Sequence, residues 1–195
     1  MKKVILFLCS LVLYSSAVLA EQCFILKEKD QIIHKEGDCD KRYAPCSTFK
    51  IALGLIGYDS GILIDEMHPS WPFKKGYPDF LDKWKQDQTP KSWVKNSCVW
   101  YSQVLTKQLG MERLQDYVTK FAYGNVDLSG DKGKNNGLTN SWLSSSLEIS
   151  GVEQIAFLEK LLNSKLPVSQ HAYEMTKSIL FVEELKNGWK LSYSR

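Results

Sequence analysis

Apolar spacing predicts a short hairpin followed by a series of helices. Alternation near the start gives two short strands, at 24–27 and 31–34, joined by the polar residues 28–30. Residues 47–57 are apolar on almost every side, which predicts a buried helix. Residues 99–109 have a helical pattern that stops at Gly110. One face of the next helix is marked by Met111, Leu114, Val118 and Phe121.

The second half of the chain is mainly helical as well. Ser150 and Glu153 form a capping box, in which two side chains satisfy free N–H groups at a helix start. The inward residues of that helix are expected to be Ile155, Leu158, Leu161 and Leu162. Another helix is expected after Pro167 and Ser169, with Tyr173, Thr176, Ile179 and Leu180 on one side.

Two polar stretches separate these helices, and a last strand is expected at 188–193. Residues 68–89 are rich in Pro, Trp and Lys and are interpreted as a loop, with at most a short helix at 80–84. Residues 128–141 are interpreted as a solvated turn, because the phosphate-loop pattern G-x-x-x-x-G-K-[ST] is absent. Strands, then helices, then a strand predict an α+β domain whose antiparallel sheet collects strands from both chain ends.

The first 20 residues have the layout of a secretory signal. Lys2 and Lys3 precede an apolar run at 4–14, and Val18 and Ala20 occupy the −3 and −1 positions of a cut after Ala20. An uncleaved membrane anchor is the alternative, but the run is short for a span. We therefore expect a signal at 1–20, one domain at 21–195, and export to the periplasm without a membrane association after cleavage.

Composition is that of an ordinary globular domain. The 195 residues are 44% hydrophobic and 24% charged, with a formal net charge of +3, to which Lys2 and Lys3 contribute two. A nearly neutral mature chain gives no reason to expect a nucleic-acid partner. The composition does not predict the oligomeric state.

Four cysteines remain once Cys9 is set aside with the signal. Cys23 and Cys39 flank the predicted hairpin, and an exported chain can oxidise them to a disulfide. Zinc is the alternative, but there is no C-x-x-C pair and the histidines are scattered, so no metal site is expected. Cys46 is expected to be a small buried residue rather than a reactive thiol.

Ser47 and Lys50 lie three positions apart in APCSTFKIALGL, at 44–55. That spacing lets the amine reach the hydroxyl from the same side of a helix. A helix start offers free N–H groups and a positive dipole end to a developing oxyanion. Burial lowers the pKa of a lysine, and a neutral amine can activate a serine. The alternative is that Ser47 only caps the helix and Lys50 extends to water.

Further short motifs follow in order: SCV at 97–99, YGN at 123–125, and Trp142 in NSWLSSSLEIS. Alone, each has an ordinary explanation as a helix cap, a turn or part of the core. Together with STFK at 47–50, they resemble the class D, or oxacillinase-type, serine β-lactamases over nearly the whole chain after the signal. The resemblance implies a penicillin-binding transpeptidase-like fold, an antiparallel sheet with a helical region.

The resemblance also implies roles for three catalytic residues. Ser47 would be the nucleophile that forms an acyl-enzyme with the carbonyl of a β-lactam. Lys50 would be carboxylated by CO2 or bicarbonate and act as the general base, with no other cofactor. Ser97 would return the proton to the leaving nitrogen.

Five further residues would line the site. Val99 would limit water in the lysine pocket, and Trp142 would donate its indole N–H to the carboxylated amine. Tyr123, Gly124 and Asn125 would close part of the site wall. The expected partners are β-lactam small molecules.

The family also carries a K-T-G strand that binds the substrate carboxylate and supplies a second oxyanion donor. No K-T-G occurs here, and the sequence closes with KNGWKLSYSR at 186–195. We therefore expect a C-terminally truncated or altered form without the closing strands and helix, and poor hydrolysis by this chain. Two alternatives stay open: a penicillin-binding sensor or transpeptidase-like domain that does not deacylate, and an inactive secreted remnant.

Overall fold

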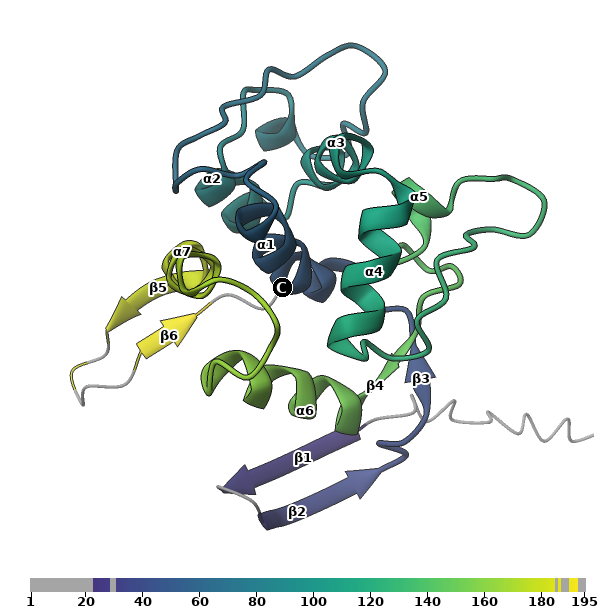
Figure 1. Ribbon diagram of the computed structural model, residues 1–195, viewed down its shortest axis with the longest axis vertical. Coiled ribbons are helices and arrows are strands. Elements are labelled where there is room, and N and C mark those ends of the chain that lie inside the picture. The colour runs from purple at the N-terminus through teal and green to yellow at the C-terminus, as the bar shows by residue number, and fades with distance from the viewer. Residues whose placement is uncertain (1–22, 29–30, 185, 187–189, 193–195) are drawn as a thin grey trace, which may run out of the picture.

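Among the residues that the structure describes, helices are the main regular elements, and three short antiparallel strand pairs lie around them (Figure 1). The computed structural model describes residues 23–28, 31–184, 186 and 190–192. In chain order the elements are β1 (Cys23–Glu28), β2 (Gln31–Gly37), β3 (Arg42–Tyr43), the 3-10 turn η1 (Cys46–Phe49), α1 (Lys50–Asp59), the 3-10 turn η2 (Asp82–Trp84), α2 (Pro90–Asn96), α3 (Val99–Leu109), α4 (Met111–Phe121), α5 (Gly137–Asn140), β4 (Ile149–Ser150), α6 (Gly151–Leu162), α7 (Gln170–Leu180), β5 (Phe181–Glu184) and β6 (Lys190–Ser192).

Helix α1 is the centre of the core. Every residue from Lys50 to Tyr58 is buried, as the apolar run predicts. α1 packs against α7 and α3 (Figure 1). The approach of α7 is close, because a Cβ on Gly54 would lie 3.3 Å from Cγ2 of Thr176. The helix that begins at Lys50 is therefore fixed from several sides.

The strands form separate pairs in the described part of the chain. β1 pairs with β2, β3 with β4, and β5 with β6, all antiparallel. The α+β class is confirmed, but the prediction of one sheet that collects strands from both chain ends is wrong for these residues. β6 pairs instead with β5, its neighbour in sequence, because a local pairing closes a much shorter loop. Residues 188–189 and 193 of the predicted last strand lie outside the described residues.

Most predicted helices are confirmed at or near their predicted bounds. α3 ends before Gly110, α6 starts at the capping box of Ser150 and Glu153, and α7 follows Ser169, whose hydroxyl accepts from the Ala172 N–H. The inward residues predicted for α7 are all buried. The predicted loop at 68–89 holds only η2, and the polar stretch at 128–141 contains the short α5.

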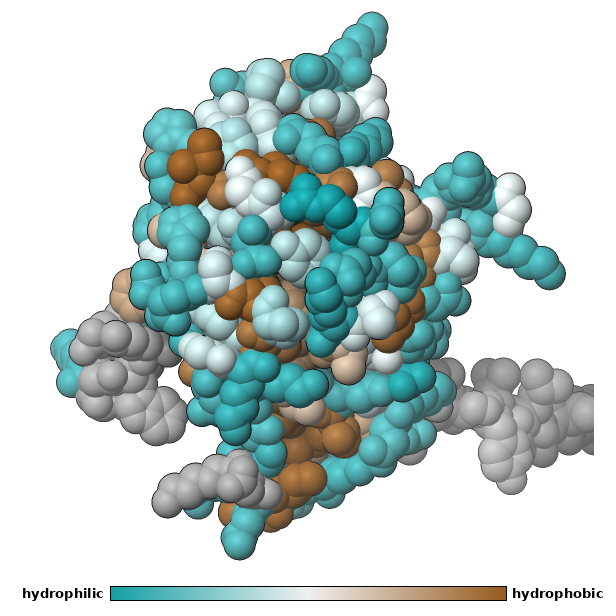
Figure 2. All heavy atoms as spheres, in the orientation of Figure 1, coloured by the Kyte–Doolittle hydropathy of each residue, from teal (hydrophilic) through white to brown (hydrophobic). Residues whose placement is uncertain are grey.

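Two apolar residues predicted to face inward are exposed instead. Met111 is the first residue of α4 and Leu162 the last of α6, and both lie at helix ends. Leu162, Leu158 and Ile155 line a groove of about 820 Å³ between α6 and β1, and Phe157 takes the inward position. Figure 2 shows the apolar surface there, at the bottom of the view.

The Cys23–Cys39 disulfide is confirmed, with 4.9 Å between the two Cα atoms. It closes the open end of the β1–β2 hairpin, beside the start of α6. The predicted signal, residues 1–20, and residues 29–30 of the hairpin turn lie outside the described residues. Among the helices that are described, none is long and apolar enough to cross a membrane.

Candidate functional site

Ser47 lies in a short 3-10 turn that runs directly into the central helix. η1 covers Cys46–Phe49, and the backbone N–H of Lys50 donates to the carbonyls of Ser47 and Thr48. The turn is tied to a distant segment, because the Cys46 N–H donates to the Trp142 carbonyl at 2.9 Å. Ser47 is thus placed by α1 on one side and by the segment around Trp142 on the other.

Ser97 follows α2 in a left-handed backbone conformation, with φ 53° and ψ 38°. Its N–H donates to the Val94 carbonyl at 3.1 Å, and the Cys98 N–H donates to the Trp93 carbonyl at 3.0 Å. This pair of bonds is a Schellman motif, in which the left-handed position is usually a glycine. The motif ends α2, a helix that the sequence analysis missed. Its N-terminal signal is Thr89 followed by Pro90, with a capping box to Ser92.

The structure brings the three predicted catalytic residues together. The Ser47 Oγ lies 2.7 Å from the Ser97 Oγ, and the Lys50 Nζ donates to the Ser47 Oγ at 3.3 Å. Lys50 is only 4% exposed, and burial lowers its pKa from 10.5 to about 8. With a pKa of about 8, about one tenth of the Lys50 amines are neutral at pH 7. With a pKa of 10.5, the neutral fraction would be well under about one thousandth. Lys50 can therefore accept the Ser47 proton near neutral pH.

Two cysteines, Cys46 and Cys98, lie near Lys50, and the sequence analysis predicted the burial of Cys46 wrongly. Cys98 is fully buried, and burial raises the pKa of its thiol to about 11, so it stays neutral beside the amine. Cys46 is exposed, and the prediction that it is buried is wrong. Its left-handed φ of 48° turns the side chain out of the helix start, where its Sγ lies 3.8 Å from the Ser144 Oγ.

Val99 lies close to Ser97 in sequence, and Trp142 contacts the turn that carries Ser47. Val99 is the first residue of α3, two positions after Ser97, and is half-buried. Trp142 is 1% exposed and packs on Phe49, with 5.5 Å between ring centroids. Within the described residues, no group of three or more His, Cys, Asp or Glu side chains is placed to hold a metal ion.

Residues 123–125, which were predicted to close the site wall, contact Phe49 and the segment that follows Trp142. Tyr123 packs edge-on against Phe49 at 5.2 Å, and its hydroxyl donates to Oε1 of Gln154 at 3.2 Å. Gly124 has φ 57°, and a Cβ there would lie 1.9 Å from the Glu148 carbonyl oxygen. Only glycine fits so close to the Glu148 carbonyl.

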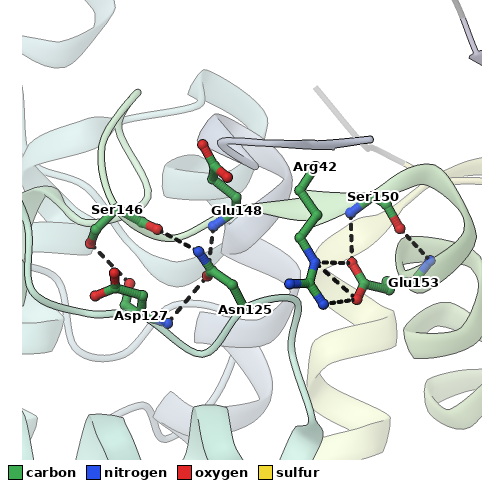
Figure 3. A network of polar contacts seen from close by, with 7 residues as sticks. All are labelled: Arg42, Asn125, Asp127, Ser146, Glu148, Ser150 and Glu153. Carbon is green, nitrogen blue, oxygen red and sulfur yellow. Dashed lines mark hydrogen bonds and ion pairs between the residues drawn. The ribbon is translucent and has the colours of Figure 1, made fainter. Parts of the chain in front are cut away.

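The side chain of Asn125 both donates to and accepts from the backbone of the same segment, as Figure 3 shows. Its Nδ2 donates to the Ser146 carbonyl at 2.8 Å, and its Oδ1 accepts from the N–H groups of Glu148, at 3.0 Å, and Asp127, at 3.2 Å. This side chain therefore fixes residues 146–148, and through them the strand β4.

A charged pair holds the other end of β4 (Figure 3). Arg42 on β3 donates from Nε and Nη2 to the Glu153 carboxylate at 2.5–3.1 Å. The same carboxylate accepts from the Ser150 N–H at 2.9 Å. These bonds lower the pKa of Glu153 to about 2, and the bonds from Arg42 make the largest contribution. Glu153 thus joins β3, which precedes Ser47 in the chain, to β4 and the start of α6.

Comparison with known proteins gives one family. Residues 27–192 match the model of the penicillin binding protein transpeptidase domain. β-Lactamase OXA-9 of Klebsiella pneumoniae is 46% identical over 158 residues, which are 80% of this chain and 58% of that protein. β-Lactamase OXA-1 of Escherichia coli is 40% identical over 175 residues, 88% of this chain and 62% of that protein.

Solved structures agree with the sequence comparison. The crystal structure of OXA-427, a class D β-lactamase, superimposes with a TM-score of 0.80 at 52% identity, over 83% of this chain and 66% of that one. The chain spans less than two thirds of the length of these relatives. It belongs to the penicillin binding protein transpeptidase domain family, and its relatives within that family are class D β-lactamases.

Proposed function

We propose that the protein hydrolyses the amide bond of β-lactam small molecules through an acyl-enzyme on Ser47, and that hydrolysis is slow because no K-T-G triplet occurs in the sequence. One observation carries this proposal: the Ser47 Oγ lies within hydrogen-bond distance of both the Ser97 Oγ and the Nζ of a buried Lys50. A serine needs an adjacent base to act as a nucleophile, and an amine with a pKa of about 8 can be that base.

The proposed acylation follows from these positions. The Ser47 Oγ bonds to the lactam carbonyl carbon while its proton passes to the base that Lys50 provides. The carbon–nitrogen bond then breaks, and the proton returns through the Ser97 hydroxyl to the leaving nitrogen. Water then attacks the ester carbonyl carbon while the same base takes its proton. The bond from that carbon to the Ser47 Oγ breaks, the proton returns to Oγ, and the ring-opened acid is released. Val99 and Trp142 would keep other water out of the lysine pocket.

Carboxylation of Lys50 fits the environment of its amine. The neutral form of an amine is the one that reacts with CO2, and burial favours that form here. The group would supply an anionic base beside Ser47. Trp142, whose segment is bonded to the start of η1, is the residue proposed to donate to it. Below pH 8 the protonated amine predominates, so both base strength and carboxylation are expected to fall in acid.

We propose in addition that residues 1–20 are a signal and that the mature domain is periplasmic. The Cys23–Cys39 disulfide supports export, because such bonds persist in oxidising compartments.

A labelled penicillin tests the proposed reaction, with Ser47→Ala as the control. Labelling at Ser47 followed by release of the label would support hydrolysis. A lasting adduct would favour a sensor or transpeptidase, and absence of labelling on folded protein would contradict the proposal.

Bicarbonate dependence tests the role of Lys50. We expect added bicarbonate to raise the rate of release, and Trp142→Ala to lower that rate and increase its dependence on bicarbonate. A rate that bicarbonate never alters, at any pH from 6 to 9, would leave the neutral amine as the base.

A further inference from the structure

The turn that presents Ser97 is held from outside α2 by two contacts on one residue, Asn96. The Trp84 Nε1 donates to the Asn96 backbone carbonyl at 2.9 Å. The Asn96 Nδ2 donates to the Oε1 of Gln88 at 3.1 Å. Asn96 is the last residue of α2 and directly precedes Ser97. Both partners belong to 84–88, the stretch that leads from η2 into α2.

The two partners of Asn96 are themselves fixed. Gln88 is fully buried, its Nε2 donates to the Lys83 carbonyl at 2.8 Å, and its backbone pairs with that of Trp71. Trp84 is 6% exposed, and its carbonyl accepts from the indole N–H of Trp100 at 2.9 Å. Buried polar groups with their bonds satisfied hold a single geometry. Asn96 is therefore attached to a fixed segment, residues 84–88. None of these hydrogen bonds involves α1.

This attachment matters because Ser97 is not a glycine. Non-glycine residues seldom occupy the left-handed region, so the turn needs support from its surroundings to keep that conformation. If the turn relaxed, the Ser97 hydroxyl would leave its position 2.7 Å from the Ser47 Oγ. A displacement of about 1 Å in a reacting group can lower a rate by about 100-fold.

We infer that Asn96 is a positioning residue for Ser97, held in place by Trp84 and Gln88, in the reaction proposed above, on which the inference rests. It acts only through the backbone of the turn.

Two variants each remove one contact. Trp84→Phe deletes the indole N–H that bonds the Asn96 carbonyl, and Asn96→Ala deletes the amide that bonds Gln88. Trp93→Phe is the matched control, because Trp93 is also buried and its indole N–H donates at 2.9 Å, but to the Ser102 Oγ. The assay is the rate constant for acylation of Ser47 by a fluorescent penicillin, with the dissociation constant of the initial complex measured separately.

Trp84→Phe and Asn96→Ala are expected to lower the acylation rate constant about 10- to 100-fold without changing the dissociation constant. Trp93→Phe is expected to change that rate constant less than about threefold. In a Ser97→Ala background, the two test variants should cause no further loss. A loss in that background as large as in the parent, or an equal loss from Trp93→Phe, would overturn the inference.

Backbone NMR separates this inference from the proposed reaction. The carbon chemical shifts of Ser97 report its left-handed conformation whether or not penicillin binds. They should move in Trp84→Phe and Asn96→Ala but not in Trp93→Phe. If the parent chain is never labelled, the proposed function fails, and these shifts alone decide the positioning role. Left-handed shifts retained in both test variants would overturn it.

Discussion

Ser97 combines an unfavourable backbone conformation with a hydroxyl that contacts Ser47. Its φ of 53° is one that glycine adopts without steric cost, whereas an L side chain loses about 1 kcal/mol there. Ser97→Gly should therefore keep the turn, raise the free energy of unfolding by up to about 1 kcal/mol, and abolish rapid acylation. Ser97→Ala should slow acylation to the same measurable residual rate, without that gain in stability. Urea denaturation of both variants measures the difference, and equal stabilities would show that the turn carries no strain.

Lys50 is expected to reduce stability at neutral pH. Its pKa is about 8 in the folded protein and 10.5 when exposed, so folding opposes protonation. Below pH 8 the burial of the charged amine lowers the free energy of unfolding by its full amount, at most about 3 kcal/mol. This loss disappears as pH rises from 8 to 10.5. Lys50→Met should stabilise the protein most at pH 7, and the gain should shrink towards pH 10.5. Denaturation in CO2-free buffer at both pH values tests this, and a gain independent of pH would contradict it.

At this scale the sequence predicted a site of Ser47, Lys50 and Ser97, and the structure places these three side chains together. Ser47 and Lys50 were predicted from their spacing, and Ser97 from the resemblance to class D β-lactamases. It did not identify Asn96, whose partners Trp84 and Gln88 bond it over 8–12 positions in sequence through a backbone carbonyl and an amide. Such contacts leave no periodic signal. The exposure of Cys46 was also unpredictable, since it depends on a left-handed φ that the residue type does not favour.

At the scale of elements, Asn125 joins the turn after α4 to the segment that leads from Trp142 to β4. Asn125→Asp keeps the shape but removes the N–H that bonds the Ser146 carbonyl at 2.8 Å. We expect a loss of about 1–3 kcal/mol in unfolding free energy, with faster hydrogen exchange at 142–148. Asn163→Asp is the control, because its Nδ2 bonds an exposed helix carbonyl at 2.9 Å. Equal losses would mean that Asn125 has no special role in this segment.

Helix limits were predictable where a local signal sets them. The Ser150–Glu153 capping box and Gly110 fix the ends of α6 and α3 without reference to the rest of the chain. Strand pairing was less predictable, because it depends on which segments meet in space. The β3–β4 pair joins residues 42–43 to 149–150, two strands too short to show any alternation.

At the scale of the whole molecule, the β1–β2 hairpin is attached mainly at its ends. The Cys39 carbonyl accepts from the Val152 N–H at 3.2 Å, and Lys27 pairs with Glu159 at 2.5 Å. β2 is exposed along its full length, so the hairpin gains little from the core. The Cys23–Cys39 disulfide is therefore expected to contribute much of the order in this part of the fold.

Removing that disulfide should loosen the hairpin and leave Ser47, Lys50 and Ser97 in place. The two cysteines are 16 positions apart, and opening a loop of that size costs about 3 kcal/mol on the chain-entropy model. The Cys23→Ser, Cys39→Ser double variant should lose up to that amount, with faster hydrogen exchange in β1 and β2. Exchange in α1 and α3 should change little, because their contacts lie elsewhere in the core. Cys46→Ser, at an exposed free cysteine, is the control and should change stability by less than about 0.5 kcal/mol. Faster exchange spread evenly over α1 and the hairpin would contradict this, and would mean that the hairpin and the core unfold as one unit.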